Sequence, residues 1–300
     1  MPTVIPSKIQ IETVAGYCNY TCIMCPIEES ERKEVMDNEM FSNILRRLQP
    51  YQAEQQFLAL CGLGETLVDK NVHEKIRISK EMSFRGVSVY TNGELLTREK
   101  TERLLDAGLD SLIVSIDGQT APTQASIRVG ANLDKVVSNT LRFLDMRNKG
   151  RYTARVIIRF TRQDLNQHEE TDFVNFWKSK IDESKNDLIS VYNVHNSGGN
   201  VLINIRAEAK SVEVRKALKC SELYDRLIIG SDGCLNFCCG DQLRHHHHIG
   251  SMLDTDPIEL YNSAIFQEYR AVMDDGRILD LDLCKDCSIA YSIVSREIGR

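Results

Sequence analysis

The sequence predicts an α/β protein: a partial (β/α)6 barrel over residues 1–206, followed by a linker and a small α+β domain over residues 207–300. Two observations favour this fold class. Apolar, strand-like runs alternate with amphipathic helical segments about six times through the first two thirds of the chain. The composition then changes after Arg206, and the remainder carries six of the ten cysteines. Because such an alternation produces parallel strands with right-handed crossovers, we expect a sheet that curls into a barrel with one open side.

The barrel elements follow from short apolar runs and from helical periodicity. Strands are expected at residues 8–14, 57–61, 86–90, 111–118, 153–160 and 188–195. Helices are expected at residues 39–48, 69–82, 97–107, 132–146 and 172–181, where apolar residues recur on one helical face. Thr97 is the expected N-cap of its helix, and Gly108 is expected to end that helix.

The second region has a different composition and three recognisable parts. A charged stretch, residues 207–217, is expected to link the two domains. Residues 227–237 read as a β-hairpin that turns at Asp232-Gly233. A helix is expected over residues 257–273, and a small α+β domain follows from these elements.

Charge and composition exclude several classes of protein. The formal net charge is −6, which argues against generic nucleic-acid binding. No apolar run approaches the ~18 residues of a membrane span, and residues 1–6 lack the pattern of a secretion signal. Ten grouped cysteines in such a chain indicate metal ligands in a reducing compartment, so we expect a cytoplasmic location.

Three cysteines lie on one short loop at the carboxyl end of the first predicted strand. Cys18, Cys22 and Cys25 are separated by three and then two residues, and the next cysteine is Cys61. Three thiolates can hold three irons of a cubane cluster and leave the fourth iron open, whereas closed clusters and structural zinc sites use four ligands. A zinc knuckle or three buried thiols is the alternative. In α/β barrels this end of the strands carries the chemistry.

This C-x3-C-x2-C loop resembles the signature of the radical S-adenosylmethionine (SAM) superfamily. The resemblance implies that the open iron binds SAM, whose cleavage gives a 5′-deoxyadenosyl radical. Gly62-Leu-Gly64-Glu65 resembles the family's G-G-E-P element, with Thr66 in place of proline, and Thr91-Asn92-Gly93 resembles its T-N-G turn. By the same resemblance, the residues expected to bind SAM are Gly64, Glu65, Asn92, Ser115, Arg128 and His195. Local alternatives remain open: an ordinary turn at Asn92, a surface ion pair at Arg128, and a core or loop histidine at His195.

The second group of cysteines is spread over the last 81 residues. Cys220 and Cys238 flank the predicted hairpin, and Cys284 and Cys287 form a C-x2-C pair, so four thiolates can converge on one cluster. The pattern resembles the auxiliary-cluster module called twitch, a shorter relative of SPASM. It implies a closed [4Fe-4S] cluster that acts as an electron relay or structural staple. A structural zinc site is the alternative.

Several other cysteines and histidines remain. Cys61 is expected to be a small core residue, and Cys234 has no assigned role. Cys239 adjoins Cys238 and should face the opposite side, where its thiol could donate a hydrogen atom to a substrate radical. A packed thiol is an equally reasonable interpretation. His245–His248 are expected to form a polar surface loop.

The function implied is that of a radical SAM enzyme with two [4Fe-4S] clusters, SAM, and a flavodoxin- or ferredoxin-type reductase as electron donor. The compact format resembles enzymes that act on aminocyclitols and aminoglycosides in antibiotic biosynthesis, so a small polar substrate is expected. Cys239 slightly favours epimerisation, and dehydrogenation of an alcohol to a ketone is the alternative. A peptide-modifying enzyme is the runner-up, although a first strand near Lys8 leaves no room for a leader-peptide module. A non-enzymatic metal-binding protein is the remaining alternative.

Overall fold

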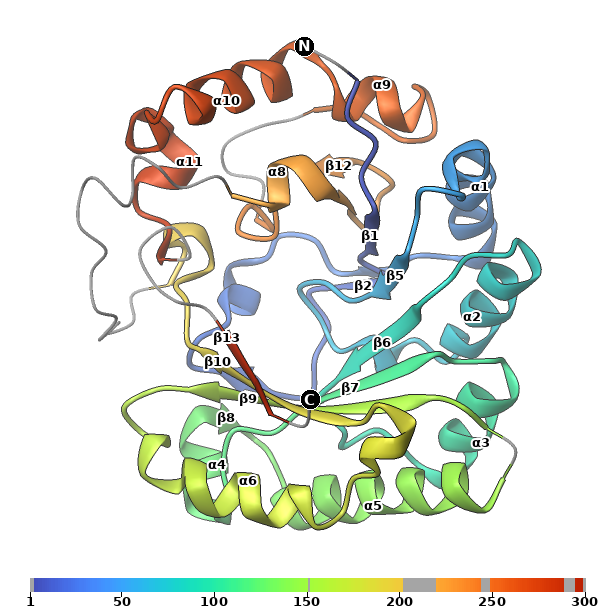
Figure 1. Ribbon diagram of the computed structural model, residues 1–300, viewed down its shortest axis with the longest axis vertical. Coiled ribbons are helices and arrows are strands. Elements are labelled where there is room, and N and C mark those ends of the chain that lie inside the picture. The colour runs from blue at the N-terminus through green and yellow to red at the C-terminus, as the bar shows by residue number, and fades with distance from the viewer. Residues whose placement is uncertain (1–2, 151, 202–219, 244–248, 289–294, 299–300) are drawn as a thin grey trace.

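A single nine-stranded sheet organises the molecule, in the order β12-β11-β1-β5-β6-β7-β9-β10-β13. The computed structural model describes residues 3–150, 152–201, 220–243, 249–288 and 295–298. The sheet curves around the interior of the molecule, and helices cover its outer face (Figure 1). Within the described residues, no helix is long and apolar enough to cross a membrane.

Six parallel strands form the barrel wall, which confirms the predicted partial (β/α)6 architecture. They are β1 (Lys8–Ile11), β5 (Phe57–Leu60), β6 (Val87–Thr91), β7 (Ser111–Ser115), β9 (Arg155–Arg162) and β10 (Leu188–Asn193). Each pairs in parallel with its neighbour in that order. β10 ends before His195, so this residue belongs to the loop beyond the strand rather than to the strand that the sequence predicts.

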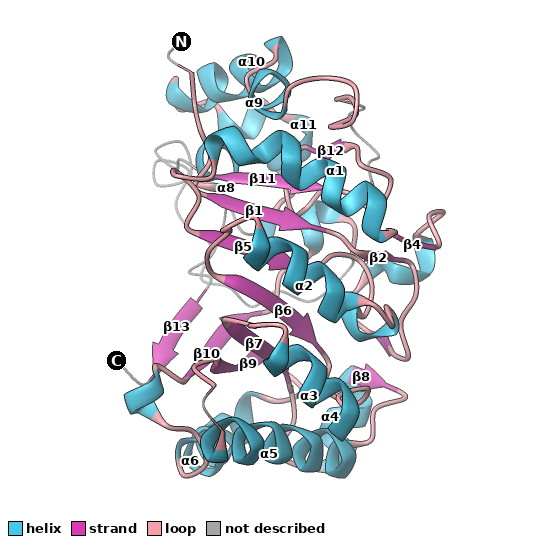
Figure 2. Cartoon of the chain, turned by 90° about the vertical axis from the view of Figure 1, so that its right-hand side faces the viewer, coloured by secondary structure: helices cyan, strands magenta, loops and turns pink. Residues whose placement is uncertain are grey.

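The helices that return the chain between strands lie outside the sheet. They are α1 (Asn38–Leu48), α2 (Val72–Glu81), α3 (Arg98–Asp106), α5 (Leu133–Lys149) and α6 (Glu170–Lys178). Figure 2 shows α1, α2 and α3 side by side in front of the strands. Thr97 caps α3 as predicted, because its side chain accepts a hydrogen bond from the Lys100 amide at 3.2 Å. Gly108 follows α3 with φ +86°, a conformation that glycine adopts at low cost.

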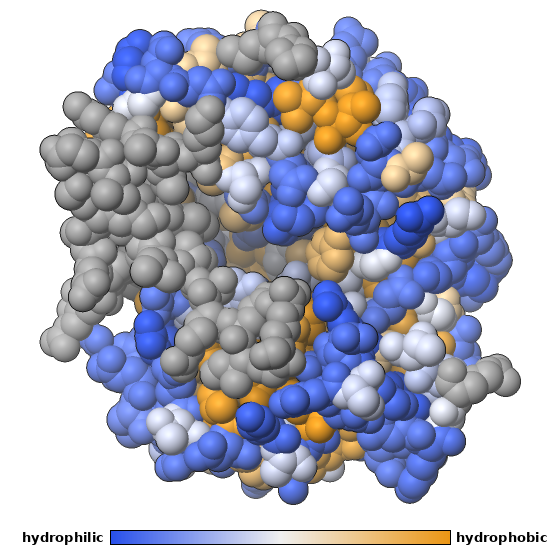
Figure 3. All heavy atoms as spheres, viewed as in Figure 1, coloured by the Kyte–Doolittle hydropathy of each residue, from blue (hydrophilic) through white to orange (hydrophobic). Residues whose placement is uncertain are grey.

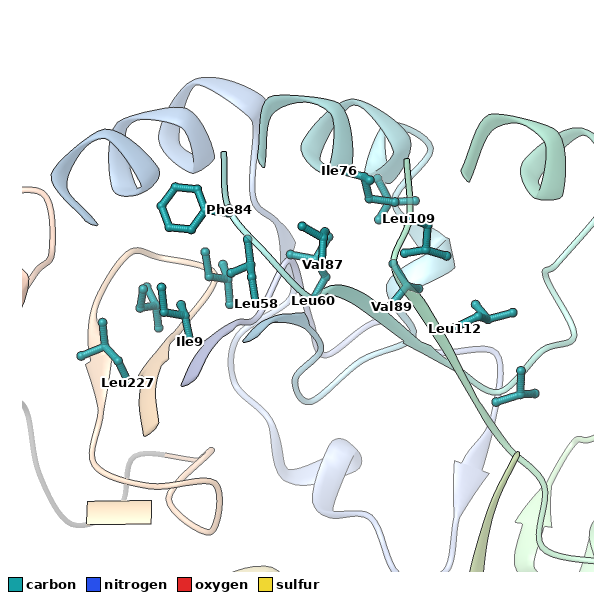
Figure 4. Packing of buried hydrophobic residues seen from close by; sticks show 14 of the residues in the cluster. Ile9, Leu58, Leu60, Ile76, Phe84, Val87, Val89, Leu109, Leu112 and Leu227 are labelled. Carbon is teal, nitrogen blue, oxygen red and sulfur yellow. The ribbon is translucent and has the colours of Figure 1, made fainter. Parts of the chain in front are cut away.

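The hydrophobic core lies between the sheet and this helical layer. Strand residues such as Ile9, Leu58 and Val87 pack against helix residues such as Ile76, and all are fully or almost fully buried (Figure 4). Burial of each large aliphatic side chain contributes about 1.5–3 kcal/mol. The core therefore fixes the strand ends that carry the polar residues of the site.

Short elements complete the barrel. They are β2 (Val14–Ala15), β3 (Thr21–Cys22), β4 (Glu34–Val35), α4 (Ala121–Ile127) and β8 (Arg128–Val129). Single turns of 3-10 helix occur at Pro26–Glu29, Gln49–Tyr51, Thr66–Val68, Gln167–Glu169, Glu183–Lys185, Ser197–Gly199 and Ile278–Asp280. The antiparallel pairs β2–β4 and β3–β8 lie outside the main sheet, and the sequence did not predict them because two-residue strands have no detectable periodicity.

The predicted hairpin of the second region extends the barrel sheet. α8 (Glu222–Asp225) leads into β11 (Arg226–Ile229), which pairs in parallel with β1, and β12 (Leu235–Asn236) pairs with β11 in antiparallel fashion. The turn uses Gly233 at φ +78°. At the other edge, β13 (Ser295–Ile298) pairs with β10 in antiparallel fashion. The expected linker and the boundary at residue 206 lie outside the described residues, and the division into domains stays a prediction.

The helix predicted over residues 257–273 is wrong in one respect, because the structure divides it. α9 (Pro257–Tyr261) and α10 (Ala264–Asp274) are separated by Asn262 and Ser263. Asn262 leaves the helical conformation at φ −115°, and its side chain exchanges two hydrogen bonds, of 2.8 and 2.9 Å, with the backbone of Val4. These bonds compete with helix continuation. α11 (Asp282–Lys285) then carries the start of the C-x2-C pair.

Candidate active site

A cavity of about 720 Å³ lies inside the curved sheet, at the carboxyl ends of the barrel strands. Figure 3 shows this face of the molecule hollowed near its middle. Its lining includes all three cysteines of the first loop together with Gly64, Glu65, Asn92, Ser115, Arg128 and His195. Cys220 and Cys239 from the second region line the same cavity. The structure therefore brings every residue predicted to bind SAM to one place, whereas their roles remain expectations.

The cysteine loop is held by a small antiparallel bridge. Cys22 in β3 pairs with Arg128 in β8, and the Arg128 Nη1 lies 3.8 Å from the Cys22 sulfur. On the other side, the Asn92 Nδ2 lies 3.8 Å from the Cys18 sulfur. Burial raises the pKa of Cys18 to about 11 and that of Cys25 to about 12. Thiols so placed are held as thiolates only by strong positive charge, which the irons of a cluster would supply.

Glu65 is a buried carboxylate whose position is fixed by three hydrogen bonds. Its Oε1 accepts from the Thr91 hydroxyl at 2.6 Å and from the Leu67 amide at 3.0 Å. Within the part of the chain that the structure describes, its Oε2 accepts one bond, from the Asn92 amide at 2.7 Å. Burial raises the pKa of Glu65, in spite of these bonds that favour its ionised form. Oε2 has room for a further donor such as an ammonium group, which fits the residue expected to hold the amino group of SAM.

Gly64 serves a close contact within the protein. A side chain there would place its Cβ 2.6 Å from the Val14 carbonyl oxygen, and the following amide of Glu65 donates to the Tyr17 carbonyl at 2.9 Å. The glycine thus lets the segment after β5 dock against the segment that leads into the cysteine loop. Gly64 also lines the cavity, and its expected part in SAM binding stays a prediction.

Arg128 forms a buried ion pair that the sequence reasoning missed. Its Nε and Nη2 both approach the Asp117 Oδ2, at 2.8 and 2.7 Å, and Asp117 is fully buried. The alternative of a surface ion pair is therefore wrong: Arg128 does form an ion pair, but the pair is buried. Asp117 follows β7, which carries Ser115, so both members of the predicted carboxylate clasp approach the cavity from neighbouring positions. An aspartate about ten residues before a candidate arginine was the signal available in the sequence.

A second group of polar residues lines the part of the cavity built by β1, β6, β9, β10, α8 and β11. It consists of Gln10, Tyr90, Arg159, Tyr192, His195, Glu222 and Arg226. Burial and the nearby Arg159 lower the pKa of His195 to about 4, so its imidazole is neutral at pH 7. The His195 Nδ1 accepts a hydrogen bond from the Ser197 amide at 3.2 Å, which assigns the proton to Nε2. Only His195 of this group was singled out from the sequence, because arginines and tyrosines carry no motif there.

The four cysteines expected around the auxiliary cluster come from distant segments. Cys220 precedes α8, Cys238 follows β12, and Cys284 lies in α11, with the Cys287 amide donating to the Cys284 carbonyl at 3.1 Å. Cys287 raises the pKa of each of the other three, after the larger effect of burial, so the four thiols share one neighbourhood. Within the described ranges, no three His, Cys, Asp or Glu side chains are placed to bind one metal ion. In a cluster each thiolate binds a different iron, whereas a zinc site needs all four thiolates on one ion. The spacing of these thiols therefore suits a cluster better than a single zinc ion.

Of the remaining cysteines, Cys61 and Cys239 line the cavity, and Cys234 lies outside its lining. Cys239 lines the cavity, as its alternation with Cys238 predicts, and burial raises its pKa well above the usual range. Cys61 also lines the cavity, so its interpretation as a core residue is wrong: it follows the last residue of β5 and lies at the open end of the strand. Cys234 forms an isolated β-bridge with Ser251. His245–His248 lie outside the described residues.

The fold and the three-cysteine cavity define an enzyme of the radical SAM class. Residues 13–171 match the Radical SAM superfamily, and residues 220–288 match the SPASM iron-sulfur cluster-binding domain. The chain belongs to the radical SAM superfamily. Its cofactors are SAM with a [4Fe-4S] cluster, and the second match implies additional iron–sulfur chemistry. The alternative of a non-enzymatic metal-binding protein is therefore wrong.

Relatives of named function match part of the chain. The S-adenosyl-L-methionine-dependent 2-deoxy-scyllo-inosamine dehydrogenase of Niallia circulans is 29% identical over 153 residues, which cover 48% of this chain and 59% of that protein. The tungsten-containing aldehyde ferredoxin oxidoreductase cofactor-modifying protein of Pyrococcus furiosus is 29% identical over 128 residues, or 41% of this chain and 35% of that protein. The chain thus matches less than two thirds of the length of either relative.

Solved structures share the fold over most of the chain. BtrN in complex with AdoMet and 2-DOIA superimposes with a TM-score of 0.61 and 18% identity, covering 94% of this chain and 93% of BtrN. Streptococcus suis SuiB bound to precursor peptide SuiA gives a TM-score of 0.68 at 14% identity, covering 89% of this chain and 67% of SuiB. One of these complexes holds a small molecule and the other a peptide, so the shared fold does not by itself select a substrate class.

Proposed function

We propose that this enzyme oxidises a secondary alcohol of a small, hydroxyl-rich substrate of the aminocyclitol or aminoglycoside class to a ketone. The observation that carries the proposal is the shared cavity. Cys18, Cys22 and Cys25 line it from one region of the chain, and Cys220 lines it from the other. A substrate held between them would lie beside both predicted clusters. The similarity to an inosamine dehydrogenase supports oxidation over the epimerisation that the sequence slightly favours.

The residues of the first cysteine loop are proposed to hold the SAM cluster. Glu65 is suited to accept from the amino group of SAM, and Ser115 and Arg128 are suited to bind its carboxylate, since the fork of Arg128 is fixed by Asp117. When bound, SAM and its cluster supply the organic radical that removes a hydrogen atom from a substrate carbon. The protein's part is to orient these groups and to exclude water from them.

The second region is proposed to accept the electron that the substrate loses. A cluster here would have four protein ligands, Cys220, Cys238, Cys284 and Cys287, and no iron open to substrate. It could then accept an electron from the substrate radical without binding the substrate. The overall reaction then balances without net reduction: one alcohol and one SAM give one ketone, one methionine, one 5′-deoxyadenosine and one proton. A reductase of the flavodoxin or ferredoxin type is needed to start the reaction, since the electron is returned in each turnover.

The proposal is tested with anaerobically reconstituted enzyme, SAM and a panel of aminocyclitols and aminoglycosides in deuterated water. By mass spectrometry, we expect a product that has two hydrogens fewer than the substrate. The molar ratio of this product to 5′-deoxyadenosine should be near one. A product of unchanged composition that gains one solvent deuterium would contradict oxidation. Formation of 5′-deoxyadenosine with a precursor peptide alone would instead favour the peptide-modifying alternative.

Epimerisation is the second candidate, and it rests on the position of Cys239. Its thiol lines the cavity, so it could return a hydrogen atom to the opposite face of a substrate radical. The resulting thiyl radical would need one electron and one proton from a one-electron reductant before the next turnover. In the Cys239→Ala variant, an oxidising enzyme keeps its rate of ketone formation, whereas an epimerising enzyme loses formation of the epimer. Cys234→Ala, which changes a cysteine outside the cavity lining, is the matched control.

A further inference from the structure

Three arginines of the described residues line the cavity, and they differ in what neutralises them. Arg128 is paired with the buried carboxylate of Asp117. Arg226 lies 3.2 Å from the Glu222 carboxylate through its Nε, and its Nη1 donates to the Gln10 Oε1 at 3.3 Å. Arg159 has neither kind of partner: among the described residues, no carboxylate forms an ion pair with it, and its buried Nε has no hydrogen-bond acceptor.

The surroundings of Arg159 fix its guanidinium without neutralising it. In the sheet its neighbours are Ser115 on β7 and Ser190 on β10, both short and uncharged. Its Cζ lies 4.5 Å from the ring centroid of Tyr192, which supports one face of the guanidinium. The N–H groups of a guanidinium point outward in its plane. A ring that contacts its face therefore leaves these N–H groups available to a ligand.

A hydrogen-bond donor, His195, also lies near Arg159. The neutral His195 presents an Nε2–H, because its Nδ1 is occupied by the Ser197 amide. His195 is close enough for the charge of Arg159 to lower its pKa, after the larger effect of burial. A half-buried cation beside a neutral donor is stabilised by an anionic ligand and destabilised by an ammonium group.

We infer that Arg159, Tyr192 and His195 form an anion subsite that binds a carboxylate or phosphate group of the substrate. The inference rests on the proposed function and narrows it: within the aminocyclitol and aminoglycoside class, the cavity selects substrates that carry an acidic group, such as a phosphorylated aminocyclitol, over purely cationic ones. The charges of Glu222 and Arg226 neutralise one another, because the two side chains form an ion pair. The charge of Arg159 is not neutralised in this way, so Arg159 favours a negatively charged ligand in this part of the cavity.

The test measures binding without turnover, so that it is independent of the reaction catalysed. Anaerobic holoenzyme loaded with SAM is titrated calorimetrically with D-glucuronate, glucose 6-phosphate, glucose and glucosamine. We expect glucuronate or glucose 6-phosphate to bind at least about tenfold more tightly than glucose and glucosamine, and the stronger of the two identifies the acidic group. Equal affinities, or a preference for glucosamine, would overturn the subsite, whatever product the enzyme forms.

Variants of β9 assign the preference to Arg159. Arg159→Gln should abolish the discrimination between the acidic and neutral sugars, and Arg159→Lys should retain part of it. Arg162→Gln is the matched control, because it removes a positive charge from the same strand at a residue outside the cavity lining. If Arg159→Gln keeps the preference, or loses SAM binding at normal iron content, Arg159 does not serve a substrate anion. The wild-type titration keeps the inference falsifiable if that variant does not fold.

Discussion

The two cysteine sites of this enzyme are built in opposite ways. The first places three thiols within eight residues of one loop, and its surroundings come from the ends of the barrel strands. The second collects four thiols from segments up to 67 residues apart, between Cys220 and Cys287. A site with three ligands leaves room for a small molecule at the metal, whereas four ligands close it. The roles proposed for the two sites, a reactive centre and an electron carrier, thus follow from the number of thiolates at each.

Removal of a thiol from the first site should have the largest effect. Cys22→Ala takes away one of three ligands, so we expect a drop of more than about 100-fold in 5′-deoxyadenosine formation and the loss of about four irons per chain. The readouts are chromatography of 5′-deoxyadenosine and iron analysis of reconstituted protein. Cys234→Ala should retain both values; equal losses in the two variants would show that any cysteine change disturbs reconstitution.

Removal of a thiol from the second site should separate SAM cleavage from product formation. We expect Cys284→Ala to keep most 5′-deoxyadenosine formation and to yield about tenfold less ketone per 5′-deoxyadenosine, because the proposed electron acceptor is lost. Quantifying both products in the same reaction gives this ratio. If ketone and 5′-deoxyadenosine decline in parallel, the four-cysteine site supports the fold of the cavity rather than electron transfer.

A smaller effect is expected from Arg128, which borders the first site. Arg128→Lys keeps the charge beside Asp117 but loses the planar fork, so we expect SAM to bind about tenfold more weakly. Arg128→Gln leaves the Asp117 carboxylate buried without a cation, and the free energy of unfolding should decrease by about 3 kcal/mol. Equilibrium SAM binding and chemical denaturation measure the two effects. Unchanged SAM affinity in the lysine variant would contradict a clasp at this position.

The smallest expected effect is a pH dependence of stability from His195. Its folded-state pKa, about 4, lies below the ordinary value near 6.5, so the unfolded chain binds the proton more readily between these values. Stability from this residue is present above pH 6.5 and is lost as the pH falls toward 4. We expect the free energy of unfolding to decrease by about 2 kcal/mol more between pH 7 and 5 in the wild type than in His195→Gln. Parallel denaturation curves would argue against a buried neutral imidazole.

The same contrast explains how far sequence reasoning reached. The cysteine loop, Gly64, Glu65 and the barrel alternation were predictable because neighbouring residues in the chain carry them. Asp117 and Arg159 were not, since their importance arises only when β7, β9 and β10 place them beside other strands. The division of the helix at Asn262 was missed for a similar reason: its competing hydrogen bonds are to Val4, 258 residues away.

The pairing of β11 with β1 has a mechanical consequence. The strand that follows Cys220 is hydrogen-bonded to the strand that leads to Cys18, and Arg32, beyond the cysteine loop, donates to the Gln242 carbonyl at 2.8 Å. Both proposed cluster sites therefore adjoin one pair of hydrogen-bonded strands, a β-ribbon, and we expect this ribbon to set the distance between them. Substitutions that loosen this ribbon should disturb electron flow while leaving each centre chemically intact.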